Sequence, residues 1–143
     1  MSASDAVAEA VAERWLARVL ASYPPAARAS LGESADPFRN PAGHALRESL
    51  RLIARELFGE MNRESLMEPL DTIVRLRAVQ GFSPSEALAF IFDLRDAATG
   101  LPQERIDELA LMAFDCYMHC REQIFELRLK ELRSQVQLAT RTE

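Results

Sequence analysis

The sequence has few of the residues on which catalytic, metal-binding and disulfide-stabilised proteins depend. It contains two cysteines, two histidines and five glycines among 143 residues. Two cysteines four positions apart do not build a disulfide framework, and no glycine-rich phosphate loop, nucleophile elbow or paired-carboxylate motif occurs. A chain of this length buries roughly 68% of its unfolded surface without disulfide or metal. We therefore expect one domain, spanning residues 1–143, around an ordinary hydrophobic core.

Basic charge and long apolar runs are also scarce. The net charge is −5, from 17 basic and 22 acidic residues, whereas nucleic-acid binding requires a basic surface. No apolar run approaches the roughly 20 residues of a membrane-spanning helix, and residues 1–20 lack the apolar core of a secretory signal. We expect a cytoplasmic protein with reduced thiols that neither binds nucleic acid nor inserts into a membrane.

The residues that are abundant favour helix. Ala, Leu, Glu and Arg dominate, and apolar residues recur at the three- and four-residue spacing of amphipathic helices. Capping residues, prolines and glycines divide the chain into an all-α bundle of about five helices. Ser4, Asn40 and Ser83 are the expected N-caps, and Pro69 is expected to kink or restart the third helix. The predicted helices span residues 5–22, 41–58, 63–80, 84–98 and 102–138, with a loop at 31–40.

The last predicted helix is longer than the domain that would hold it. It measures roughly 55 Å at 1.5 Å per residue, whereas a domain of this size has a radius of gyration of about 14 to 15 Å. Its distal half carries a thin apolar stripe close to heptad spacing. We expect that half to pair with another helix, most economically that of a second copy. The predicted interface residues are Ile124, Phe125, Leu129, Leu132 and Val136.

The chain's candidate metal or redox site lies on this same helix. Cys116 and Cys120 share one face, with His119 beside them and His44 available as a fourth zinc ligand. The same two thiols suit a redox sensor. Structural zinc sites usually draw ligand pairs from two elements, so we favour two apolar core cysteines and a surface histidine. For His44 we favour a helix-terminal role, because no nucleophile or paired acid lies near it.

Two further features leave alternatives open. Arg75 and Arg77 lie in an otherwise apolar helix and either bind an anion or form internal ion pairs, such as Arg75 with Asp71. A small-ligand pocket between helices is the second alternative. Its candidate lining residues are Phe90, Phe92, Met112, Phe114 and Met118.

Three blocks of the sequence resemble a known family. They are PFRNPAGH at 37–44, IVRLRAVQ leading into FSPSEA at 73–87, and RIDELA, AFDCYM and CREQI within 105–124. In this order they resemble the N-terminal domain of RsbRD, the RsbT co-antagonist of the stressosome. The resemblance runs from about Trp15 to Arg133. It implies a globin-like, haem-free helical fold that dimerises and serves as a signal-input module.

Within that family the chain looks similar to stand-alone members of the DsrT type, which are encoded with the Dsr membrane complex of sulfur-metabolising bacteria. We expect no haem or other cofactor and no metal, since His119 lies on the last helix, where a globin's iron ligand is not expected. The function expected is that of a non-enzymatic sensor or regulatory module that binds itself and a regulatory protein. The alternatives are a small-ligand sensor, a metal or redox sensor using Cys116, His119 and Cys120, and a DsrT-like accessory protein.

Overall fold

The computed structural model describes residues 2–32 and 37–141, which form helices joined by short connections. The helices are α1 (Ala3–Ala21), α2 (Pro25–Gly32), α3 (Pro41–Leu57), α4 (Arg63–Val79), α5 (Pro84–Leu88), the 3-10 helix η1 (Ala89–Ile91), α6 (Leu94–Ala97) and α7 (Gln103–Arg141). No strand occurs within these described ranges, which confirms the predicted all-α class. No helix in the same ranges is long and apolar enough to span a bilayer.

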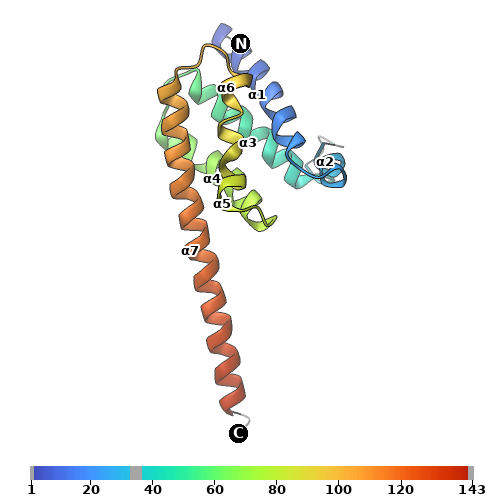
Figure 1. The fold of residues 1–143 in the computed structure, drawn as a ribbon, viewed down its shortest axis with the longest axis vertical. Helices are drawn as coiled ribbons and strands as arrows, with labels where there is room; N and C mark the ends of the chain where they lie inside the picture. Colours follow the sequence, from blue (N-terminus) through green and yellow to red (C-terminus); the bar gives the residue numbers. More distant parts are fainter. Residues whose placement is uncertain (1, 33–36, 142–143) are drawn as a thin grey trace.

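The core forms where α1, α3, α4 and the first half of α7 meet. α3 packs against both α1 and α4, and α4 packs against α7. Each of these helices contributes a side chain with no exposed surface, namely Trp15, Leu50, Ile73 and Leu109. Figure 1 shows α1 to α6 gathered around one half of α7, whose other half extends alone to the C-terminus.

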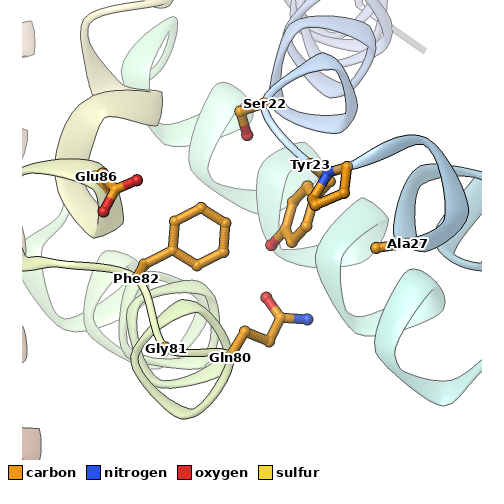
Figure 2. A pocket seen from close by; sticks show the side chains of 8 residues that line it. Ser22, Tyr23, Ala27, Gln80, Gly81, Phe82 and Glu86 are labelled. Atoms are coloured by element: carbon orange, nitrogen blue, oxygen red, sulfur yellow. The ribbon is translucent and has the colours of Figure 1, made fainter.

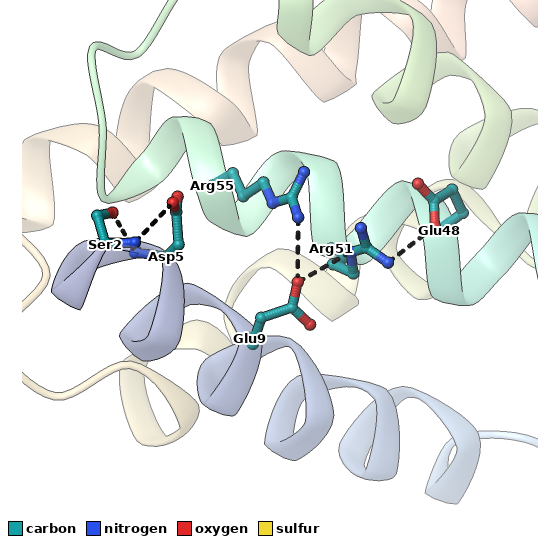
Figure 3. Close-up of polar contacts among 6 residues, drawn as sticks. All are labelled: Ser2, Asp5, Glu9, Glu48, Arg51 and Arg55. Carbon is teal, nitrogen blue, oxygen red and sulfur yellow. Dashed lines mark hydrogen bonds and ion pairs between the residues drawn. The ribbon is translucent and has the colours of Figure 1, made fainter.

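Exposed polar contacts hold α1 against α3 outside the core (Figure 3). The Glu9 carboxylate forms an ion pair with Arg51 Nε at 2.9 Å and accepts a hydrogen bond from Arg55 Nη2 at 3.3 Å. Arg51 also pairs with Glu48 at 3.6 Å within α3. Such exposed ion pairs contribute about 0.2–1 kcal/mol each, so the buried apolar side chains account for most of the packing energy between these helices.

The first helix begins two residues earlier than predicted, at Ala3. Ser2, not Ser4, is the N-cap of α1. The Ser2 hydroxyl accepts from the backbone N–H of Asp5 at 3.2 Å, and the Asp5 carboxylate accepts from the Ser2 backbone N–H at 3.3 Å. Ser2 is favoured as the cap because the third residue after it, Asp5, is an acid and completes a capping box.

The predicted helix 84–98 is instead three short helices, α5, η1 and α6. Side chains from elsewhere occupy the carbonyl groups that a continuous helix would use. Trp15 Nε1 donates to the Phe90 carbonyl at 2.7 Å, while Arg77 Nε donates to the Ala87 carbonyl at 3.1 Å and its Nη2 to the Glu86 carbonyl at 2.8 Å. Tertiary hydrogen bonds therefore replace part of the helical ladder.

Around the predicted loop 31–40 the prediction is half right. Leu31 belongs to α2, which the sequence did not predict, and residues 33–36 lie outside the described part of the chain. Asn40 caps α3 as predicted, accepting from the Gly43 N–H at 3.0 Å and donating to the Leu31 carbonyl at 2.7 Å. A Cβ at Gly43 would collide with the Asn40 side chain and with the Leu31 carbonyl oxygen, so glycine is required there. Pro69 lies inside an α4 that continues from Arg63 to Val79 without restarting.

Candidate interaction surface on the last helix

α7 has two apolar faces that point in nearly opposite directions. One face packs against α4 and includes Leu109, Ala113 and Cys120, none of which has exposed surface. At about 100° per residue, the other face lies roughly 160° around the helix. The buried residues of α7 are Ile106, Leu109, Met112, Ala113, Cys116, Tyr117 and Cys120.

The second face, here called the outward stripe, is apolar and largely uncovered. Its members fall within about 60° of arc around the helix. From Phe125 to Val136 they follow the alternating four- and three-residue spacing of a coiled-coil seam. Leu129 is half-buried, and the other members are between 43% and 71% exposed. The outward stripe consists of Leu111, Phe114, Met118, Phe125, Leu129, Leu132 and Val136.

Beyond Cys120, contacts between α7 and the body of the protein become few, although Gln123 accepts from Arg75 and Ile124 is half-buried. None of the described residues 121–141 is buried, and Figure 1 shows this half projecting past the other helices. The helix contains 39 residues, which corresponds to roughly 58 Å. Most of the stability of a helix in a protein comes from tertiary packing of its apolar face. The distal half therefore presents an apolar stripe that no other described helix covers.

The predicted interface residues lie on two sides of α7. Phe125, Leu132 and Val136 are exposed on the outward stripe, together with the half-buried Leu129. Ile124 is half-buried on another side of the helix and lines a hollow with residues of the α4–α5 connection, and Phe125 borders the same hollow. The outward stripe thus contains four of the five predicted residues.

Sequence reasoning missed the proximal members of the outward stripe. Phe114 and Met118 were candidate pocket residues, but both are exposed, as is Phe92, whereas Phe90 and Met112 are buried in the core. These five side chains do not share a cavity. A seven-residue repeat in the sequence could have identified them, since Leu111, Met118, Phe125 and Leu132 occupy equivalent positions along the helix.

The cysteines belong to the packed face of α7. Cys116 and Cys120 are buried and carry free thiols, whereas His119 is exposed. Burial raises the pKa of the Cys116 thiol to about 11, and the carboxylates of Asp71 and Asp115 act in the same direction. A protonated thiol is a poor nucleophile and a poor metal ligand. Within the described residues, no three His, Cys, Asp or Glu side chains are grouped to hold a metal ion.

His44 lies on α3, in its first turn, and is half-buried. It lines a shallow hollow between α3 and α4 together with Glu48 and Glu64. The structure therefore places His44 and the Cys116–Cys120 pair on different helices, and His44 is not among the buried side chains that pack around the cysteines.

The two arginines of α4 have different surroundings. Arg75 forms the predicted ion pair with Asp71 at 3.3 Å and also donates to Gln123 of α7 at 2.8 Å. Arg77 is only 1% exposed, and its guanidinium lies 4.3 Å from the centre of the Phe82 ring. It bonds backbone carbonyls and the Ser22 hydroxyl but forms no ion pair with a described acidic residue. Internal contacts therefore occupy both arginines.

Comparison with known proteins identifies the family to which the chain belongs. Residues 9–101 match the model of the RsbT co-antagonist protein RsbRD N-terminal domain, which is more than half of the chain and ends before α7. An uncharacterized protein of Archaeoglobus fulgidus is 29% identical over 140 residues, covering 90% of this chain and 86% of that protein. No solved structure matches significantly, so the globin-like arrangement remains a prediction. The predicted resemblance is confirmed: the chain belongs to the RsbRD N-terminal domain family, a family of regulatory domains and not a known family of enzymes.

Proposed function

We propose that this chain is a non-enzymatic regulatory module that works as a homodimer, paired through the outward stripe of α7. The observation that carries the proposal is the uncovered heptad seam from Phe125 to Val136 on a helix with no buried residue in that half. Contiguous exposed apolar surface of this kind marks an interaction site. A heptad seam is complementary to another helix, because knobs at these positions fit the holes of a second seam.

The charges beside the seam are compatible with a second copy in parallel orientation but do not select that orientation. Phe125 and Leu132 take the same core position in successive heptads. In this register Arg121 and Arg128 flank the seam on one side, and Glu126 flanks it on the other. A two-fold axis along a parallel pair brings opposite flanks together, so Arg121 would face Glu126 of the second copy. An antiparallel pair would bring like flanks together. In the parallel pair Arg128 would likewise face Arg133, a like-charge contact that offsets the attraction between Arg121 and Glu126.

The family supports the regulatory part of the proposal. The matched region, residues 9–101, ends just before α7, so α7 is the element through which a signal received by α1–α6 would reach another protein. Stressosome-type signalling and a DsrT-like accessory role in sulfur metabolism both suit such a module. In either setting, we propose a cytoplasmic protein whose contacts are with itself and with a regulatory protein.

A pair of charge substitutions on α7 tests the proposed dimer. Leu132 and Leu127 are similarly exposed, at 57% and 60%, but only Leu132 lies on the outward stripe. Leu132→Glu should weaken the dimer by about 100-fold or more, because it would bury an unpaired charge at the centre of the seam. Leu127→Glu adds the same charge and should leave dimerisation nearly unchanged. Sedimentation equilibrium of both variants and the wild type measures this.

Two outcomes of that experiment would contradict the proposal. A wild-type chain that stays monomeric at high micromolar concentration removes the dimer altogether. Equal weakening by the two substitutions would show that net charge, and not the outward stripe, controls association. Circular dichroism of each variant provides the control for folding.

A further inference from the structure

A hollow of about 280 Å³ lies between α7 and the connection from α4 to α5. Ala78 and Phe82 line it from one side. α7 borders it from Tyr117 to Arg128, on both sides of the last buried residue of that helix, Cys120. Its volume is just below the roughly 300–1,000 Å³ of small-molecule sites, and it suits one bulky side chain inserted from outside.

This hollow is basic, whereas the neighbouring pocket is acidic. The neighbouring pocket, of about 500 Å³, lies beside Tyr23 between the end of α1 and the same connection (Figure 2). Phe82 lines both, but the charged residue that lines the pocket beside Tyr23 is Glu86. The charged residues that line the hollow beside α7 are Arg121 and Arg128, and no acidic residue of the described chain lines it. The hollow therefore attracts a negatively charged group.

Neither arginine has an acidic partner among the described residues, although the chain has 22 acidic and only 17 basic residues. Arg121 donates to the Tyr117 hydroxyl at 3.3 Å, and Glu131, three positions after Arg128, forms no ion pair with it. An intrahelical partner is absent because the positions four residues away from each arginine carry no acid. Those positions hold Tyr117, Ile124, Phe125 and Leu132. Both cations are thus available to an acid from another molecule.

Aromatic and aliphatic side chains form the rest of the hollow. Phe82 and Ile124 are half-buried, and Phe125 is 63% exposed. The Phe82 ring is held from behind, because the Arg77 guanidinium lies 4.3 Å from its centre and the Tyr23 ring packs edge-on to it at 5.2 Å. Arginine and aromatic residues are enriched at the energetic centres of protein–protein interfaces. The lining therefore suits a segment of a protein.

The spacing of the two arginines indicates what kind of segment fits. Arg121 and Arg128 are seven residues apart, which is roughly 10.5 Å along α7. Two acidic residues seven positions apart on a partner helix have the same separation and lie on one face. A residue three or four positions after the first acid lies on that face between them. An apolar side chain at this position would be opposite the hollow.

We propose that the hollow docks an acidic helix of a regulatory partner protein, whose bulky apolar side chain enters the hollow while carboxylates on either side of it pair with Arg121 and Arg128. This inference names the chemistry of the regulatory partner, and it rests on the proposed function for the existence of such a partner. Glu108, Leu111 and Asp115 of α7 follow the same pattern of acid, apolar residue and acid. A second copy bound in this way would make an unclosed, head-to-tail contact, so a separate partner is the better occupant.

Peptide selection tests this inference without assuming a sequence. Random dodecamers displayed on phage are selected against the 143-residue chain, and the enriched peptides are synthesised and measured by fluorescence anisotropy. They should carry two acidic residues seven positions apart with a bulky apolar residue between them. No enrichment, or enriched peptides without acidic residues, would overturn the proposal. Equally tight binding of a peptide comprising residues 104–123 of this chain would assign the hollow to another copy and would also overturn it.

Three variants locate the bound peptide. Arg128→Glu should weaken its binding by at least about tenfold, because like charges would then face each other. Lys130→Glu makes the same charge reversal on another side of α7, outside the hollow, and should have little effect. Ala78→Leu narrows the hollow without a change of charge and should weaken binding to a similar extent as Arg128→Glu. Equal effects of the two charge reversals, or unchanged binding to Ala78→Leu, would contradict the proposed site.

The docking result and the dimer are measured separately. A wild-type chain that is monomeric in sedimentation yet binds the selected peptides through the hollow would contradict only the dimer. A dimeric chain that enriches no acidic peptide would contradict only the docking proposal.

Discussion

Both halves of α7 carry an apolar stripe, thinner in the distal half, but the two halves have opposite surroundings. From Gln103 to Cys120 the helix packs on α4, and seven of its residues are buried. From Arg121 to Arg141 none is buried, although Phe125, Leu132 and Val136 continue the apolar spacing. The contrast shows that burial depends on what lies opposite a face and not on its hydrophobicity alone. In the distal half no described part of the chain supplies the opposing surface.

The largest expected effect is a difference in the free energy of unfolding between substitutions on the two faces of α7, within one turn of the packed half. Leu109 has no exposed surface, whereas Leu111 is 71% exposed. Leu109→Ala should lower the free energy of unfolding by about 2–5 kcal/mol, because it leaves a cavity against α4. Leu111→Ala, the same truncation on the outward stripe, should change it by less than about 0.5 kcal/mol in the monomer. Urea denaturation of both variants measures the difference, and equal losses would refute the assignment of faces.

The next effect is a loss of folding stability at alkaline pH, caused by the buried Cys116 thiol of the packed half. Burial raises the pKa of Cys116 from 9.0 to about 11, so the folded state holds this proton more tightly than the unfolded state. The stabilisation is complete below about pH 9 and should be lost, by about 2 kcal/mol, as the pH rises to 11. Cys116→Ala should flatten this part of the profile relative to the wild type.

Burial also raises the pKa of Tyr23, so the informative quantity is the difference between wild type and Cys116→Ala. An unchanged profile in the variant would mean that the thiol is not protected by burial. Rapid alkylation of the native protein at neutral pH would lead to the same conclusion.

The smallest effect marks the point where packing ends. Arg75 of α4 donates to Gln123 of α7 at 2.8 Å, just beyond the last buried residue, Cys120. Gln123→Ala should lower the free energy of unfolding by about 1 kcal/mol through loss of this hydrogen bond. Gln135→Ala, in the projecting half, should have no measurable effect. Equal effects of the two substitutions would place the boundary between the halves elsewhere.

Local signals were sufficient to predict much of this fold. The caps at Asn40 and Ser83, the length of α7 and the burial of its two cysteines follow from residue type and spacing. The Arg75–Asp71 ion pair was predictable because its partners are four residues apart on one helix. In each of these cases the determining neighbours lie close in sequence.

Long-range contacts account for what the sequence did not predict. Helix 84–98 is divided because Trp15 and Arg77, distant in sequence, bond its carbonyl groups. The pocket beside Tyr23 is formed by two segments almost sixty residues apart, and no motif marks it. The direction of the outward stripe depends likewise on which side of α7 faces α4.

Hydrogen exchange across residues 121–141, measured over a range of protein concentrations, tests the central claim most directly. If two copies pair along the outward stripe, these amides should be protected at high concentration and lose protection on dilution, while amides near Leu109 stay protected throughout. Fast exchange of residues 121–141 at every concentration would contradict the account, because the distal half would then have no partner in a second copy.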